Sequence, residues 1–347
     1  MSSDSYVPLF EATRGHIREA VQFGALVVVN VNGEILAHEG DPELVTFLRS
    51  SAKPFQALPF MESHGDDHFH LNNTEVAIMC ASHAGTDDHV RVLEDFQNKI
   101  GINESQLRCG THPPFDSATS HRLIQEGLHP TSNRHNCSGK HTGMLAYGIL
   151  RGFPLEEYTS IDHPVQRQIL LTFSEMVDVP VDQVEVGIDG CSVPTFAVPL
   201  RNAALGYARL ADPGRLSPIR MDACQRIVKA MTSNPMMIAG PKLFDTLLME
   251  LAGDKFLTKM GAEGFQSLSI LPNAIEPGSP GLGVALKIAD GDLDGRVRPV
   301  VMLELLRQLG AISASELDSL KGIARRPIYN FRHMQVGEYR PAFTIKR

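Results

Sequence analysis

The stretch Arg49-Ser50-Ser51-Ala52-Lys53-Pro54 joins the start of a helix to a serine–lysine pair. It predicts a helix that begins near Ser51 and runs toward Met61, because proline is tolerated in the first turn, where its missing amide hydrogen is not required. Ser50 and Lys53 then form the pattern S-x-x-K, which places the lysine amine near the hydroxyl on one helix face. About one such spacing is expected by chance in a chain of this size, so further residues must support a catalytic reading.

The chemistry that this pair offers is an activated hydroxyl. A serine hydroxyl is a weak nucleophile, and a lysine becomes its base only when burial or a second cation lowers the lysine pKa. Two later segments offer the missing groups. Ser82, in Cys80–Gly85, is a candidate second nucleophile or proton relay, although it also fits a plain helix end. Lys259 ends an expected strand and precedes a glycine-rich turn, although such a lysine is often a solvated surface residue.

Two short loops each place one cysteine beside serine and glycine. Asn136-Cys137-Ser138-Gly139-Lys140-His141 precedes a helical run, and Asp189-Gly190-Cys191 follows a strand-like run. Three interpretations are open: a nucleophilic cysteine with Lys140 or His141 as its base, a zinc site that uses both thiolates, or two buried and inert cysteines. Asp189 lies beside a glycine, where backbone can approach a ligand, and it is a candidate for binding a substrate ammonium.

The composition excludes several classes of partner. The 347 residues carry a formal charge of -8, so no basic excess is present to bind nucleic acid or an anionic membrane surface. The five cysteines are an odd and sparse set, which favours a reducing cytoplasm over a disulfide framework. The first fourteen residues lack the apolar core of a signal peptide, and the longest apolar runs are too short to span a bilayer. We therefore expect a cytoplasmic protein that acts on a small molecule and needs no organic cofactor.

Strand-like segments lie toward both ends of the chain and helical segments through its middle. Residues 26–31 and 34–38 predict a hairpin around Asn32-Gly33, a pair typical of a type I′ turn. The pattern predicts helices at 75–80, 87–100, 140–150, 164–177, 218–231, 242–251 and 300–309, and strands at 184–188, 256–259, 265–270 and 283–289. We expect an α/β or α+β sandwich, with a mixed sheet that has helices on both faces. Without a linker in the sequence, residues 1–347 are predicted to form a single catalytic unit with a helical subregion at roughly 50–250.

Taken together, these segments resemble two known groups of enzymes. The order of S-x-x-K, a second serine and K-x-G is similar to that of the penicillin-recognising serine enzymes, in which the three elements meet in one cleft. More specifically, six segments taken in order resemble the rhizobial-type, or class 3, L-asparaginases of the asparaginase II family: Arg49–Ala57, Cys80–His83, Arg108–Pro113, Asn136–Leu145, Asp189–Thr195 and Lys259–Gly264. The resemblance extends from about residue 10 to about residue 340.

The resemblance implies a fold like that of serine β-lactamases and glutaminases, a homodimer, and hydrolysis of L-asparagine to L-aspartate and ammonia. By motif position, Ser50 with Lys53 and Ser82 with Lys259 are the two catalytic serine–lysine pairs. Cys137, Lys140 and Cys191 match positions that bind a zinc-like ion in the family. Arg49, His141 and Asp189 match positions that line that site and are taken as substrate-binding residues.

Rival interpretations differ from this one in measurable ways. A glutaminase or a penicillin-recognising hydrolase on a similar fold would differ in substrate. A catalytically silent amino-acid sensor would bind asparagine without consuming it, although a binding protein has no need of an activated hydroxyl. A hydrolase that uses zinc-bound water would lose all turnover on chelation.

Overall fold

The computed structural model describes residues 5–346, which divide into two compact units. The first unit comprises residues 1–48, 198–212 and 261–347, and the second comprises residues 49–197 and 213–260. The first unit thus draws its strands from both chain ends. The prediction that the whole chain acts as a single catalytic unit stays a prediction.

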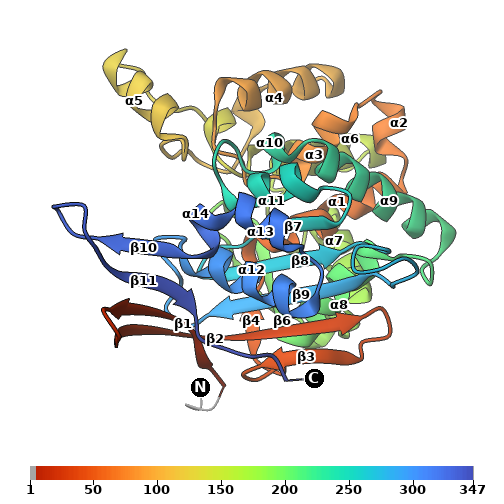
Figure 1. The fold of residues 1–347 in the computed structure, drawn as a ribbon. Coiled ribbons are helices and arrows are strands. Elements are labelled where there is room, and N and C mark those ends of the chain that lie inside the picture. Colours follow the sequence, from red (N-terminus) through yellow and green to blue (C-terminus); the bar gives the residue numbers. More distant parts are fainter. Residues whose placement is uncertain (1–4, 347) are drawn as a thin grey trace. The chain divides into compact units, whose positions relative to one another are not determined.

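An antiparallel sheet forms the centre of the first unit (Figure 1). Its strands follow the order β10-β11-β1-β2-β9-β8, and β3 also pairs with the long strand β2. The strands of this unit are β1 (Val7–Arg14), β2 (Ile17–Asn30), β3 (Ile35–Glu39), β4 (Val45–Phe47), β8 (Phe265–Ile270), β9 (Leu282–Ile288), β10 (Arg326–Tyr329) and β11 (Gln335–Pro341). Burial of β8 and β9 on both faces explains why these segments are nearly continuous apolar runs.

Helices cover this sheet on both faces, with α12 in front of it and α8 behind it in Figure 1. The helices of this unit are α8 (Leu200–Ala211), α12 (Val297–Leu309), α13 (Ala314–Ser319) and α14 (Lys321–Ala324). On the α8 side, Gly283 lies so close to the helix that a Cβ atom there would stand 1.8 Å from the carbonyl oxygen of Ala204. Ser269, opposite Gly283 in the register, donates to the carbonyl of Tyr207 at 2.7 Å. The predicted mixed α/β class with helices on both faces is confirmed.

The β2–β3 hairpin is present, but its turn differs from the expected type. Gly33 has a φ of 81°, whereas Asn32 is not among the residues with positive φ, which a type I′ turn requires at both central positions. Instead, the side chain of Asn30 accepts the backbone N–H groups of Asn32 and Glu34. An asparagine side chain at the end of the strand therefore organises a longer loop.

The second unit is mostly helical. Its helices are α1 (Lys53–Glu62), α2 (Gly65–His68), α3 (Asn73–Met79), α4 (Asp87–Ile100), α5 (Ser117–Gln125), α6 (Ser138–Arg151), α7 (Pro164–Val177), α9 (Pro218–Ser233), α10 (Pro235–Ile238) and α11 (Phe244–Ala252). Short 3₁₀ turns lie at Arg49–Ala52, Glu104–Gln106, Ser132–Arg134 and Val181–Gln183, and the strands are β5 (Glu185–Ile188), β6 (Pro194–Pro199) and β7 (Phe256–Met260). The predicted helical middle region is confirmed.

Two glycines allow α6 to approach α3 closely within this unit. A Cβ atom on Gly139 would stand 2.0 Å from the carbonyl oxygen of Ile78, and one on Gly143 would stand 2.9 Å from the sulfur of Met79. Gly139 and Gly143 are four residues apart and so share one face of α6. Because α3 leads directly to Ser82 and α6 carries Lys140, this contact sets the spacing between the two candidate groups.

Several predicted helices agree with the structure, and others were not predicted. Helix α4 has the expected bounds, and Ser217 caps α9 as expected, accepting the backbone N–H of Arg220. Helices α5 and α8 had no clear signal, because α5 is short and α8 is buried along most of its length. No helix within residues 5–346 is both long and apolar enough to cross a membrane.

Candidate active site

The hydroxyl of Ser82 lies between two buried lysines. Lys53, the first residue of α1, donates to Ser82 Oγ at 3.0 Å, and Lys259, on β7, donates to the same oxygen at 2.8 Å. Both lysine residues are fully buried, and Ser82 is only 2% exposed. Three of the four predicted catalytic residues therefore meet at one oxygen atom, although they are 29 and 177 positions apart along the chain.

Ser50 is placed next to this group in sequence but is bonded differently. Ser50 lies in the 3₁₀ turn Arg49–Ala52, just before Lys53, and is half-buried. Among residues 5–346, no hydrogen bond joins Ser50 to either lysine, whereas the neighbouring Ser51 donates to the carbonyl of Lys259 at 2.7 Å. Ser50 is thus the more accessible of the two serines, whereas the Ser82 hydroxyl already accepts hydrogen bonds from two lysines.

Burial lowers the pKa of both lysines. Burial, followed by the nearby Lys53 ammonium, lowers the pKa of Lys259 to about 7. Burial also lowers the pKa of Lys53, whose amine additionally donates to the carbonyl oxygens of Ala81 and Asn136. Two carbonyl acceptors favour the charged form of Lys53. Lys259 is therefore an amine that can accept a proton near neutral pH.

Asp245, on α11, organises the strand that carries Lys259. Its carboxylate accepts the backbone N–H of Met260 at 2.7 Å and the hydroxyl of Thr258 at 3.3 Å. The carbonyl of Met260 in turn accepts the Lys259 amine at 2.8 Å. The negative charge of Asp245 raises the pKa of Lys259 and opposes the effect of burial. No motif in the sequence marks Asp245 as a functional residue.

The two predicted thiols lie beside the predicted lysine ligand. Lys140 donates to Cys191 Sγ at 3.0 Å, and Cys137, Lys140 and Cys191 are all buried. The Cys191 thiol donates to Cys137 and holds the pKa of Cys137 well below its usual value. Although burial opposes it, the two sulfurs raise the pKa of Lys140. Two soft sulfur atoms and one amine are thus neighbours, and the positive charge of the ammonium balances the negative charge of a thiolate.

The predicted substrate-binding residues divide into an ion pair and a histidine. The Arg49 guanidinium contacts Asp189 Oδ1 through Nη2 at 2.8 Å and Nε at 2.9 Å. Arg49 has a φ of 51°, in the left-handed region that costs a non-glycine residue energy, just before Ser50. His141 lies deeper, fully buried, with its Nδ1 atom 2.7 Å from the hydroxyl of Tyr158.

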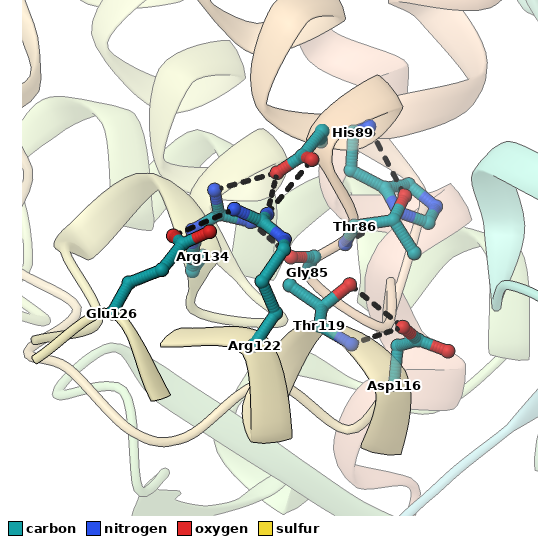
Figure 2. Close-up of polar contacts among 9 residues, drawn as sticks. Gly85, Thr86, His89, Asp116, Thr119, Arg122, Glu126 and Arg134 are labelled. Atoms are coloured by element: carbon teal, nitrogen blue, oxygen red, sulfur yellow. Dashed lines mark hydrogen bonds and ion pairs between the residues drawn. The ribbon is translucent and has the colours of Figure 1, made fainter. Parts of the chain in front are cut away.

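A network of ion pairs fixes the loops that carry Ser82 and Asn136 (Figure 2). Arg134 donates to the carbonyl of Gly85 at 2.8 Å and to Asp87 at 2.7 Å. Arg122 of α5 makes two further bonds to Asp87, at 2.7 and 2.8 Å. Arg134 therefore ties the loop after Ser82 to the loop before Asn136, whose carbonyl receives the Lys53 amine.

The site contains residues that sequence reasoning missed. The main-chain carbonyls of Ala81 and Asn136 hold Lys53, and a carbonyl carries no sequence signal. Tyr158 lies in an irregular segment between α6 and α7, with no motif around it. Within residues 5–346, no cluster of three or more histidine, cysteine or acidic side chains is arranged to hold a metal ion, so any cation here depends on the Lys140 amine.

Comparison with known proteins gives one family and a set of remote structural likenesses. The family model for L-asparaginase II matches residues 10–341. A search of curated proteins finds no match.

The solved structures that match include a probable glutaminase from Bacillus subtilis complexed with 6-diazo-5-oxo-L-norleucine. The sequence identity is 14%, the match covers 82% of this chain and 83% of that chain, and the TM-score is 0.38. A covalent complex of the Bacillus subtilis glutaminase YbgJ with 5-oxo-L-norleucine matches at 13% identity. This match covers 84% of this chain and 89% of that chain, with a TM-score of 0.40. With TM-scores this low, the family assignment rests on the family model alone.

Proposed function

The chain belongs to the L-asparaginase II family, and on that premise we propose that this amidohydrolase converts L-asparagine to L-aspartate and ammonia. The observation that carries the proposal is the Ser82 hydroxyl held between Lys53 and Lys259. A buried hydroxyl between two amines, one with a pKa near 7, is suited to moving protons during acyl transfer.

In the proposed reaction, Ser50 Oγ attacks the side-chain carboxamide carbon of asparagine. Ser50 takes this role because it is half-buried and accessible, whereas the Ser82 oxygen already bonds to two lysines. The Ser50 proton passes to the lysine–serine–lysine group and from there to the departing nitrogen. The C–N bond breaks, ammonia leaves, and water hydrolyses the resulting serine ester to release aspartate.

The charged groups of the site have separate roles in the proposed reaction. Lys259, with its pKa near 7, accepts and returns the proton through Ser82. Lys53, held as an ammonium by carbonyl oxygens, stabilises the negative charge that develops on the carbonyl oxygen during attack. Arg49 and Asp189 offer charges of both signs to the two charged groups of a free amino acid.

Cys137, Lys140 and Cys191 are the residues that would hold a zinc ion. After loss of the Cys191 and Lys140 protons, two thiolates and an amine would suit zinc in type and would fill three of the four positions that it prefers. A bound ion would supply positive charge that favours substrate binding, while the serine–lysine group performs the hydrolysis. Chelation should therefore raise KM more than it lowers kcat, and complete loss of turnover would instead favour a zinc-bound water.

Ammonia release from L-asparagine and L-glutamine, measured side by side with nitrocefin turnover, tests the proposed substrate. We expect release from asparagine to dominate, and preferred hydrolysis of glutamine or nitrocefin would replace the proposal with that activity. Calorimetry that shows asparagine bound and never consumed would identify an amino-acid sensor.

Replacement of each serine tests the proposed nucleophile. S50A should abolish the acyl-enzyme seen after acid quench and mass spectrometry, and S82A should slow its formation. S63A is the matched control, because the Ser63 hydroxyl donates to the carbonyl of Pro59 at the end of α1. Near-full hydrolysis by S50A would transfer the role of nucleophile to Ser82. A homodimer and a cytoplasmic location are further expectations of the family resemblance, and gel filtration tests the first of them.

A further inference from the structure

His141 carries a buried ring nitrogen that has no hydrogen-bond partner. The Nε2 atom is sealed from solvent and unpaired within residues 5–346, while Nδ1 lies 2.7 Å from the Tyr158 hydroxyl. An unpaired buried polar atom is costly, so such an atom in a native site calls for an explanation. The neighbours of His141 include Lys140 and Lys53, which place positive charge around the ring, and Cys137, whose negative charge opposes that of Lys140.

The hydrogen bonds of Tyr158 determine which nitrogen of His141 carries the proton. The Tyr158 oxygen accepts the backbone N–H of Arg108 at 2.9 Å, and its own proton then has His141 Nδ1 as its acceptor. In the opposite arrangement, with Nδ1 donating, both the hydroxyl proton and the Nε2 lone pair lack a partner. With these contacts, a neutral ring carries its single proton on Nε2.

We propose that Tyr158 is a positioning residue that fixes His141 as the Nε2–H tautomer, and that this N–H donates to a carboxylate oxygen of the amino-acid substrate. The choice of ligand rests on the proposed function, whereas the tautomer does not. A protonated Nε2 has no lone pair for a metal, so His141 is excluded as the fourth ligand of a cation held by Cys137, Lys140 and Cys191. The positive charge of Lys53 and Lys140 favours an anionic acceptor.

The surroundings of Tyr158 hold it in place for this role. The residue is 1% exposed, and its ring meets that of His141 edge to face, with centroids 5.6 Å apart. Gln166, on α7, donates to the backbone carbonyl of Tyr158 at 2.8 Å. A hydroxyl fixed at both its donor and its acceptor side can hold an imidazole in one orientation.

Nitrogen-15 NMR of the unmodified protein tests the tautomer without relying on any activity. The ring resonances of His141, identified by their loss in H141Q, should show a bare Nδ1 and a protonated Nε2 across neutral pH. A protonated Nδ1 or a charged ring overturns the proposal, whether or not the protein hydrolyses asparagine.

The Y158F variant tests the positioning role, with Y147F as its matched control. Tyr147 is a buried tyrosine of α6 whose hydroxyl bonds to Ser63. We expect Y158F to raise the KM for asparagine and the Kd for aspartate about tenfold, a loss of about 1.4 kcal/mol, with kcat changed less than threefold. The nitrogen-15 spectrum should then show both tautomers of His141.

H141Q should keep tighter aspartate binding than H141N, because a glutamine amide reaches the Nε2 position. Equal effects of Y158F and Y147F, or a fall in kcat at unchanged KM, would overturn the positioning role. Aspartate binding is measured by calorimetry and needs no turnover, so these results are separate from failure of the asparaginase assay.

Discussion

The two units bury charged side chains in different ways. In the first unit the buried ions meet opposite charges: Arg298 bonds to Asp292 at 2.9 Å, and Glu11 is paired with Arg18 and Arg340. The second unit also pairs buried carboxylates with cations, as in Glu75 with Lys99, but three of its buried lysines meet hydroxyl, carbonyl and sulfur atoms instead of carboxylates. These are Lys53, Lys140 and Lys259. Buried charge is tolerated when it is paired, and so lysines buried without a carboxylate partner require a reason other than stability.

The contrast separates ions that hold the fold from amines to which we assign a role in the proposed reaction. The Arg298–Asp292 pair also supports backbone, since Arg298 donates to the carbonyls of Gly261 and Phe265. Lys259, by contrast, is left with a pKa of about 7, far below that of a free lysine. A perturbed amine beside a hydroxyl is the arrangement that acid–base catalysis requires. The predictions below are chosen to separate the two kinds of buried charge.

The largest expected effect is on turnover in the second unit. K53M removes the ammonium that contacts Ser82 and should lower kcat for asparagine about 10²–10⁴-fold. K229M, an exposed lysine on α9, is the control and should leave kcat unchanged. Steady-state ammonia release provides the measurement, and a kcat within threefold of the unmodified enzyme would show that Lys53 is structural.

The next effect is on stability in the first unit. R298M leaves Asp292 buried without its partner and should lower the free energy of unfolding by about 3–5 kcal/mol. Urea unfolding followed by circular dichroism measures this loss. At urea concentrations too low to unfold R298M, the hydrolysis rate per folded molecule should change little. A loss of turnover as large as that of K53M would remove the distinction between the units.

K259M should act in the opposite direction on stability. The pKa of Lys259 is about 7 in the folded protein and about 10.4 in an unfolded chain, so the folded state is disfavoured most below pH 7. This cost declines as the pH rises toward the unfolded value. K259M should therefore raise the melting temperature by about 2 °C or more at pH 6, and by less at pH 9, while turnover falls. A lower melting temperature at pH 6 contradicts the prediction.

The smallest expected effect is on the pH profile. In the unmodified enzyme, kcat/KM should rise as Lys259 loses its proton near pH 7, in the field of Lys53, Cys80, Cys137 and Asp245. Asp245 raises the pKa of Lys259, so D245N should move this acid limb down by about 0.5–1 pH unit. D254N, on an exposed loop, is the control. A limb that stays in place would show that another group controls it.

Local sequence patterns predicted much of this architecture, because their causes are local. Asp87–Ile100 forms α4 with the expected bounds, since its apolar stripe and its two initial aspartates all favour one helix. Proline at the second position of α1 marked the start of that helix within two residues. Where the cause was a distant contact, as for the buried α8, no local pattern was available.

The candidate site was predictable as a set of residues but not as a bonding pattern. The S-x-x-K spacing suggested that Lys53 would serve Ser50, whereas its amine bonds to Ser82, 29 positions away. Helix spacing cannot reveal this, because the 3₁₀ turn before α1 changes the direction of Ser50. Tyr158 and Asp245 act through contacts between segments, and such contacts follow only from the folded chain.

The glycine contact between α3 and α6 has a consequence for protein engineering. Gly139 touches the backbone of Ile78, so no repacking of side chains can make room for a larger residue there. Mutant libraries aimed at altered substrate preference should therefore leave Gly139 and Gly143 fixed and vary the loops instead. A larger residue at Gly139 would have to shift Ser82 relative to Lys140, whereas one at Gly143 would have to displace the Met79 side chain.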